Sequence, residues 1–132
     1  MIREEIQKRL KKTVAKGVNF EISFAPYGFG DYSSNVALVE AKTKGQNPMS
    51  AALEIIAGLK KDKKFFGLFS DITLAEPGFV NFHLGTNVLR EELQEVLKKN
   101  EKYGSAKIGK GKKVNIEFVS ANPTGPLTLG NG

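Results

Sequence analysis

The sequence contains no cysteine and no tryptophan, and His83 is its only histidine. These absences exclude a disulfide framework, a cysteine-ligated zinc site and a histidine cluster, so we expect no metal site. No apolar run approaches the roughly 20 residues that cross a bilayer. The first residues, Met1 to Glu5, are charged and lack the apolar core of a secretory signal. We therefore expect no membrane partner and a cytoplasmic protein.

Positive charge is the clearest compositional excess. Lysine and arginine number 20 against 14 acidic residues, which gives a formal charge of +6. Such an excess favours a polyanionic partner, because cations that neutralise phosphates release bound counterions. The charge gathers in three runs: Lys8 to Lys16, Lys60 to Lys64 and Lys107 to Lys113. Each run is also explained by a solvated surface, so charge alone indicates no sequence preference.

Apolar periodicity predicts helices and strands in the first half of the chain. Ile2, Ile6, Leu10 and Val14 recur every four residues, which is typical of an amphipathic helix, and Gly17 ends it. Later elements follow from alternation, from Ser, Asn and Pro at helix starts, and from Gly at helix ends. They are a strand over 19–24, a helix that Ser33 or Ser34 caps and Gly45 ends, and a helix from Asn47-Pro48 to Leu59.

The second half predicts a hairpin, one more helix and a linker. Residues 60–64 are expected to form a loop, and Pro77-Gly78 separates apolar runs over 65–75 and 79–84, as in an antiparallel hairpin. A helix follows from Thr86 or Asn87, and glycines among lysines over 103–113 indicate a linker. The fold class is therefore α+β: a small antiparallel sheet of three to four strands, packed with about four helices on one face.

The segment from Val114 to Gly132 has a different pattern. Val114, Ile116 and Phe118 alternate with polar residues, which predicts a strand with a buried face. A loop with three Pro or Gly positions follows, and Gly130-Asn131-Gly132 suits the start of a helix that receives phosphates. An ordinary Pro/Gly turn explains the spacing equally well.

The run Glu117-Phe118-Val119-Ser120-Ala121-Asn122-Pro123-Thr124-Gly125-Pro126-Leu127 resembles the segment that leads into the HIGH signature of arginyl-tRNA synthetases. Residues 29–38 and 77–84 follow the order of that family's N-terminal additional domain. The resemblance implies a D-loop-binding domain over 1–107. It also implies, over 108–132, a linker and the first strand of a Rossmann-type class I catalytic domain, truncated at the HIGH-like motif. The parent would be an arginine-tRNA ligase, and this fragment alone is expected to be inactive.

The resemblance also assigns residues of the parent's active site. Thr128 and Asn131 take the catalytic places, and with Gly130 they match the ATP signature, although both family histidines are absent. Ser120 and Asn122 match positions that contact arginine. ATP with Mg²⁺ and L-arginine would be substrates of the parent, and we expect no cofactor bound by the fragment.

The tRNA contacts implied by the resemblance lie in the hairpin and the loop before it. Each of three residues also has a structural explanation. Asn81 could equally form a buried structural hydrogen bond, Phe82 could occupy a core position, and Asp31 could be a turn or cap residue. We expect a monomer that binds tRNA(Arg); the alternative is a free-standing RNA-binding module without ligase activity. The assigned residues are Asn81, Phe82, Leu84, Asp31, Tyr32 and Asn35.

Overall fold

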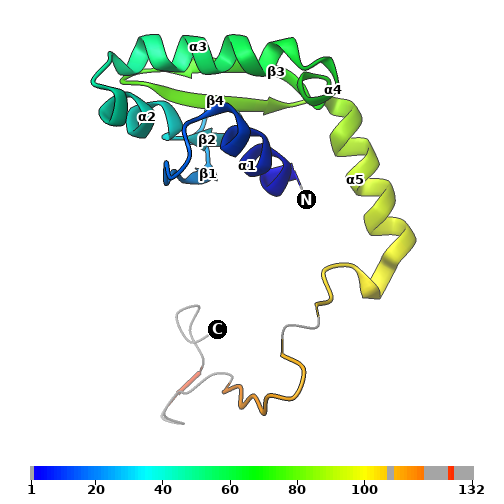
Figure 1. Ribbon diagram of the computed structural model, residues 1–132. Helices are drawn as coiled ribbons and strands as arrows, with labels where there is room; N and C mark the ends of the chain where they lie inside the picture. Colours follow the sequence, from blue (N-terminus) through cyan, green and yellow to red (C-terminus); the bar gives the residue numbers. More distant parts are fainter. Residues whose placement is uncertain (1, 107–108, 118–124, 127–132) are drawn as a thin grey trace. The chain divides into compact units, whose positions relative to one another are not determined.

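The computed structural model describes residues 2–106, 109–117 and 125–126 (Figure 1). The chain divides into two compact units, one ending at Lys98 and the other beginning at Lys99. Each is described by itself. The domain boundary expected between residues 107 and 108 stays a prediction.

A four-stranded antiparallel sheet lies at the centre of the first unit. Its strands are β1 (Ile22–Phe24), β2 (Tyr32–Ser34), β3 (Phe69–Ala75) and β4 (Phe79–Leu84), in the order β1-β2-β4-β3. The predicted hairpin is confirmed, since β3 and β4 pair from Ala75 opposite Phe79 to Phe69 opposite Leu84. The predicted α+β class is confirmed as well.

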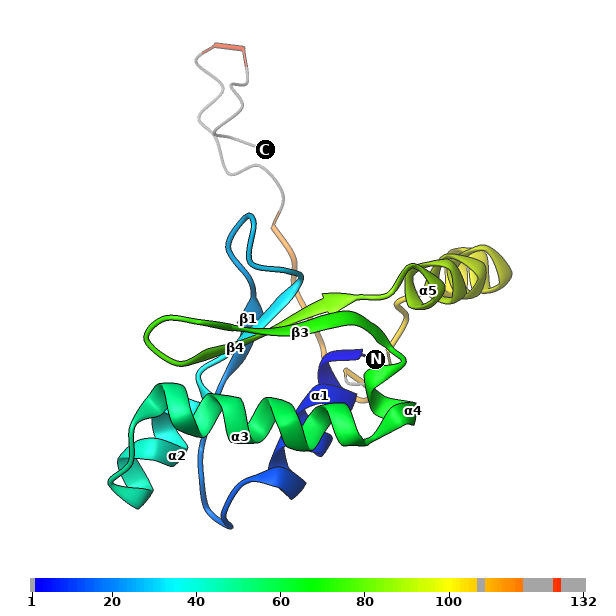
Figure 2. The same cartoon turned by 90° about the horizontal axis from the view of Figure 1, so that it is seen from above.

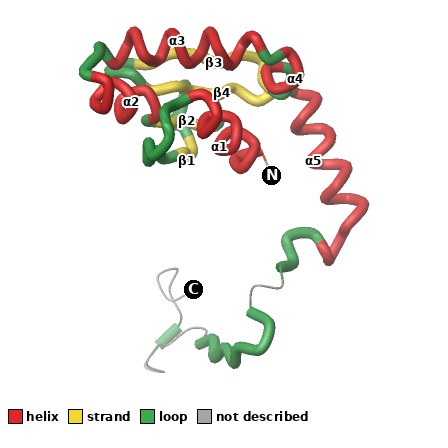
Figure 3. Tube along the Cα trace, viewed as in Figure 1, coloured by secondary structure: helices red, strands yellow, loops and turns green. Residues whose placement is uncertain are grey.

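Helices precede, separate and follow the strands (Figure 3). Asn47 accepts hydrogen bonds from the Met49 and Ser50 N–H groups and Pro48 takes the first helical position, as predicted. Gly45 ends its helix with φ 65°, a left-handed conformation that glycine adopts without a steric penalty. The helices are α1 (Ile2–Thr13), α2 (Val36–Lys44), α3 (Pro48–Lys61), α4 (Lys63–Phe66), α5 (Thr86–Lys99) and the short 3₁₀ turn η1 (Asn100–Lys102).

Helices α1 to α4 lie on one face of the sheet (Figure 2). Ile72, Val80 and Phe82 point from the sheet into the core between these layers, where they meet Leu10 of α1 and Leu59 of α3. No helix of the unit formed by residues 2–98 covers the opposite face, which we call the open face (Figure 2). Alternation along β4 places Asn81 on the open face, between the core residues Val80 and Phe82.

Two local predictions were wrong because hydrogen bonds outweighed composition. Tyr32–Ser34, expected as a loop and helix cap, forms strand β2, which is too short to show a period of two. Asn35 takes the N-cap position of α2, although the Ser34 hydroxyl still accepts the Val36 N–H at 3.3 Å. Lys60 to Lys64 do not form a loop: α3 continues to Lys61, and α4 starts after Asp62. The Asp62 carboxylate accepts the Lys64 and Phe65 N–H groups and so starts a helix within a lysine run.

Three predicted strands are shorter than expected or not found among the described residues. The run predicted over 65–75 forms a strand only from Phe69 to Ala75, because Phe65 and Phe66 belong to α4. Only Ile22–Phe24 of the run over 19–24 pairs with a neighbour. Val114 to Glu117, the described part of the last predicted strand, have no strand conformation. A strand requires a hydrogen-bonded neighbour, and no described segment pairs with these residues.

Candidate functional site

Asn81 lies at a hollow on the open face. The hollow has a volume of about 320 Å³. In the sheet register, Ser33 of β2 and Thr73 of β3 lie directly opposite Asn81, so all three side chains share the open face. We call this feature the Asn81 hollow; its lining residues are Ser23, Phe24, Pro26, Phe29, Ser33, Ala75, Glu76, Phe79 and Asn81.

Asn81 is a buried residue whose side-chain amide is not used in a hydrogen bond in the described part of the chain. The residue is 2% exposed. Among the described residues, no recorded side-chain hydrogen bond uses its amide, which offers two N–H donors and one acceptor oxygen. The Asn81 amide atoms are not among the enclosed, unpartnered atoms of the described residues, so they remain accessible from the hollow and can pair with a ligand there. The amide is therefore arranged to recognise a group that enters the hollow.

Aromatic rings form much of the wall of this hollow. Phe29 is 49% exposed, and Phe79 is half-buried on the same face of β4 as Asn81. Exposed aromatic side chains around a polar floor are the arrangement in which unpaired nucleobases stack and are read by hydrogen bonds. The hollow therefore suits a planar ring with polar edges.

Tyr32 lies on the other face of the sheet. It is opposite Phe82 and Phe24 in the register, and its ring stacks on Phe24 with centroids 5.4 Å apart and planes at 23°. The structure therefore does not bring Tyr32 and Asn81 together. Ser33 is the β2 residue beside Asn81, and it was missed because β2 itself was not predicted.

Asp31 and Asn35 use side-chain oxygens to hold the backbone. An Asp31 carboxylate oxygen accepts the Leu84 N–H at 2.7 Å, and the Asn35 amide oxygen accepts the Glu21 N–H at 2.8 Å. These bonds fix the loop before β2 to the end of β4, and the start of α2 to the residue before β1. Both residues thus shape the scaffold around the hollow.

Phe82 and Leu84 point toward the core, not the open face. Phe82 is fully buried and its ring lies 5.4 Å from that of Phe69; Leu84 packs against the core cluster. Complete burial of Phe82 conflicts with the direct RNA contact that the resemblance implied for it, whereas contact by the half-buried Leu84 stays a prediction. The physical reason is strand alternation, which puts Phe82 and Leu84 opposite in direction to Asn81.

The active-site residues that the resemblance assigned are not placed. Ser120, Asn122, Thr128, Gly130 and Asn131 lie outside the described residues. Within the described ranges, no group of three or more metal-ligating side chains occurs, and no helix is long and apolar enough to cross a membrane.

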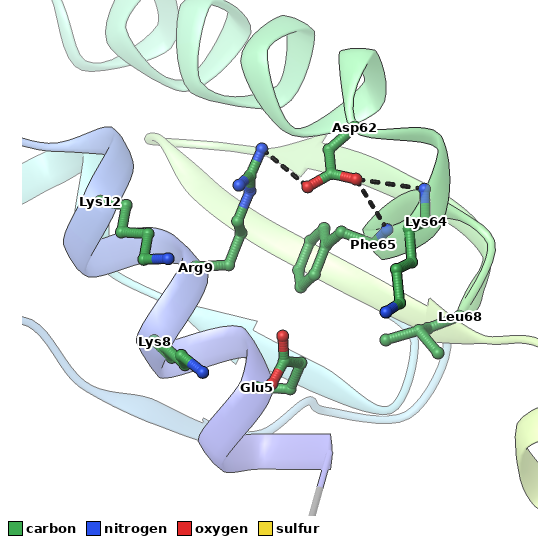
Figure 4. A pocket seen from close by; sticks show the side chains of 8 residues that line it. All are labelled: Glu5, Lys8, Arg9, Lys12, Asp62, Lys64, Phe65 and Leu68. Carbon is green, nitrogen blue, oxygen red and sulfur yellow. Dashed lines mark hydrogen bonds and ion pairs between the residues drawn. The ribbon is translucent and has the colours of Figure 1, made fainter.

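A second cavity, of about 480 Å³, lies between α1 and α4 (Figure 4). Arg9 forms an ion pair with Asp62 at 2.9 Å at its edge. Hydrogen bonds from the Phe65 and Lys64 N–H groups, together with the Arg9 charge, lower the pKa of the Asp62 carboxyl below its usual 3.8. Asp62 is thus an ionised, fully engaged group. We call this feature the α1–α4 cavity.

Comparison with known proteins gives matches of sequence and of fold. A family model described as "Arginyl tRNA synthetase N terminal domain" matches residues 1–84. The arginine--tRNA ligase of Thermotoga maritima is 40% identical over 132 residues, which cover 99% of this chain and 23% of that ligase. The arginine--tRNA ligase of Listeria welshimeri is 45% identical over 102 residues, covering 77% of this chain and 18% of that ligase.

Two solved structures share the fold. The arginyl-tRNA synthetase from Plasmodium falciparum has a TM-score of 0.59 at 20% identity and covers 72% of this chain and 17% of that one. The Thermus thermophilus arginyl-tRNA synthetase has a TM-score of 0.57 at 22% identity. The match covers 70% of this chain and 15% of that synthetase. The chain thus spans less than a quarter of the length of these relatives.

Proposed function

The chain belongs to the arginyl-tRNA synthetases, whose N-terminal domain family it matches over residues 1–84, and from this premise we propose that its open face binds the D-loop of tRNA(Arg). The observation that carries the proposal is the Asn81 amide, which makes no side-chain hydrogen bond within the described residues and lines a hollow together with Phe29 and Phe79. A D-loop offers unpaired nucleobases, which fit such a hollow by stacking and edge hydrogen bonds.

The described residues divide into those that touch the base and those that hold the site. Asn81 pairs with the edge of an unstacked base, while Phe29 and Phe79 contact its faces. Asp31 and Asn35 position the surrounding loops through their backbone hydrogen bonds. Tyr32 supports the edge of the sheet through its stack with Phe24. The net charge of +6 adds attraction to RNA of any sequence.

The parent protein is proposed to be an arginine-tRNA ligase that activates arginine with ATP and transfers it to tRNA(Arg). In it Thr128, Gly130 and Asn131 would meet ATP with Mg²⁺, and Ser120 and Asn122 would meet arginine. The family relationship supports this assignment. We also propose that the parent is a cytoplasmic monomer.

The test compares tRNA(Arg) with an unrelated tRNA by fluorescence anisotropy across a salt series, using the 132-residue chain. We expect tighter binding of tRNA(Arg), and we expect Asn81→Ala to reduce that preference about five- to thirtyfold, the worth of one or two hydrogen bonds. Asn19→Ala, at an exposed asparagine, is the matched control.

Two outcomes would contradict the proposal. Equal loss of affinity for both tRNAs in Asn81→Ala would remove base recognition from the hollow. No preference for tRNA(Arg) in the unmodified chain would favour the alternative of a general RNA-binding module.

A further inference from the structure

The α1–α4 cavity joins two basic runs that are about 50 residues apart in the sequence. Lys8, Arg9 and Lys12 come from α1, and Lys64 comes from α4 (Figure 4). Lys8 and Lys12 are four residues apart, so they lie on the same face of α1. Phe65 and Leu68 contribute apolar surface to the lining. The tertiary structure thus creates a concave cationic site that neither run forms alone.

The charges of this cavity are not balanced internally. Four cationic and two anionic side chains line it. Asp62 is occupied by Arg9 and by the two N–H groups that it caps, and Glu5 is the only other carboxylate of the lining. No ion pair within the described residues is recorded for Lys8, Lys12 or Lys64. The lining of the cavity therefore carries an excess of positive charge, which a bound anion would offset.

Arg9 shows that the site has unused donor capacity. Its recorded ion pair joins one terminal nitrogen to Asp62, and its Nε is buried without a hydrogen-bond partner in the described residues. A guanidinium carries five N–H donors in a planar fork that matches phosphate oxygens. A donor that is enclosed without an acceptor costs free energy, so a bound anion that reorients or pairs this guanidinium is favoured.

We propose that the α1–α4 cavity binds a backbone phosphate of RNA, through Lys8, Lys12 and Lys64 with Arg9 as a supporting donor. RNA is chosen as the source because it is the polyanion of the proposed function, on which this choice rests. The site is distinct from the Asn81 hollow, since the cavity lies between helices that cover the other face of the sheet. It contributes affinity for RNA without reading its sequence.

The experiment measures the salt dependence of tRNA binding in a triple variant, Lys8→Gln, Lys12→Gln and Lys64→Gln. All three lysines are exposed, so the fold should be retained, as circular dichroism would verify. The slope of log K against log salt should fall by about 0.7–0.9 for each phosphate that the variant no longer neutralises. The matched control is Lys42→Gln, Lys61→Gln and Lys98→Gln, which removes the same charge from exposed lysines that do not line the cavity.

A larger decrease of slope in the cavity variant than in the control supports the site. Equal decreases in both variants would overturn it, because they would show only general charge attraction. If the triple variant is unstable, Lys12→Gln against Lys42→Gln repeats the comparison with one charge.

A local readout is the Arg9 Nε–H resonance in ¹H–¹⁵N spectra of the chain. Titration with tRNA should shift this resonance at concentrations that shift no other arginine Nε–H signal as far. An unmoved resonance would overturn the proposal. A shift with inorganic phosphate but not with tRNA would also overturn it, since the cavity would then take only small anions.

Failure of this site and failure of the Asn81 proposal give different results. The cavity variant should weaken both tRNAs equally and leave the preference for tRNA(Arg) intact. Asn81→Ala should reduce the preference and leave the salt slope unchanged.

Discussion

The carboxylate of Asp31 accepts the backbone N–H of Leu84 at 2.7 Å, across 53 residues of sequence. The Asp31 N–H in turn donates to the Phe82 carbonyl at 2.9 Å. These two bonds fasten the loop before β2 to the end of β4. The loop contributes Pro26 and Phe29 to the Asn81 hollow. The shape of the site therefore depends on the hydrogen bonds that Asp31 makes with β4.

Asp31→Ala should lower the free energy of unfolding by about 1 kcal/mol, because the Leu84 N–H loses a charged acceptor at an exposed position. Asp31→Asn should lower the free energy of unfolding by less, because the asparagine amide oxygen can still accept the Leu84 N–H. Urea denaturation of the two variants checks this order. Equal losses would mean that the hydrogen bond contributes little.

Gly30→Ala should be more destabilising than Gly28→Ala. Both glycines have positive φ, +97° and +86°, so both substitutions strain the backbone, at about 1–3 kcal/mol. A Cβ at Gly30 would also lie 2.8 Å from the Phe82 carbonyl oxygen, whereas one at Gly28 meets nothing within 4 Å. Thermal unfolding of the pair separates the steric cost from the φ cost. Equal midpoints would argue against close packing at Gly30.

Alanine substitutions of the neighbouring β4 residues Phe82 and Asn81 should reduce stability by different amounts. Phe82→Ala should cost about 3–5 kcal/mol of stability, since it empties a fully buried ring position. Asn81→Ala should cost less than about 1 kcal/mol, because the amide makes no recorded hydrogen bond. Chemical denaturation gives both values. A large loss for Asn81→Ala would favour the structural alternative for this residue.

Asp62 should support stability in its ionised form. Its folded-state pKa lies below the usual 3.8, chiefly because of the Phe65 N–H bond, so folding favours the carboxylate. The contribution is complete above pH of about 4–5, and it disappears as the pH falls through the lowered pKa. Asp62→Asn retains a capping oxygen but not the charge. The difference in free energy of unfolding between the unmodified protein and this variant should therefore decrease as the pH falls.

Measuring the free energy of unfolding against pH for both proteins checks this. Asp71, whose pKa the Lys60 hydrogen bond also lowers, provides a comparison: Asp71→Asn should show the same direction. A wild-type advantage that grows below pH 3.8 would contradict both assignments.

The long elements and the hairpin were predictable because each has a local cause. Four-residue spacing of apolar side chains produced α1, Asn47-Pro48 started α3, and Gly45 ended α2. Strand β2 was not predictable, since three residues carry no periodicity and their conformation is set by pairing with β1 and β4. The prediction of a loop over residues 60–64 was wrong for a related reason. The lysine-rich composition does not show that Asp62 caps the helix α4.

The candidate site was foreseen in part. Asn81 was selected from its place in the hairpin and from family resemblance, and its burial and free amide agree with a recognition role that stays to be tested. Phe82 and Leu84 were selected by the same resemblance, but strand alternation turns them into the core. Ser33 gave no signal, because its importance comes from a register partner, Asn81, in a strand far along the chain.

Periodicity, composition and contiguous motifs are local properties, and they were sufficient to predict the α+β class, the positive charge and the family. Which side chains share a face could be known only from the folded chain. Sheet register separates Asn81 from Tyr32 and joins it to Ser33, and packing of α1 beside α4 converts two lysine runs into one cavity. Such neighbours arise from contacts between distant segments, and no local pattern encodes them.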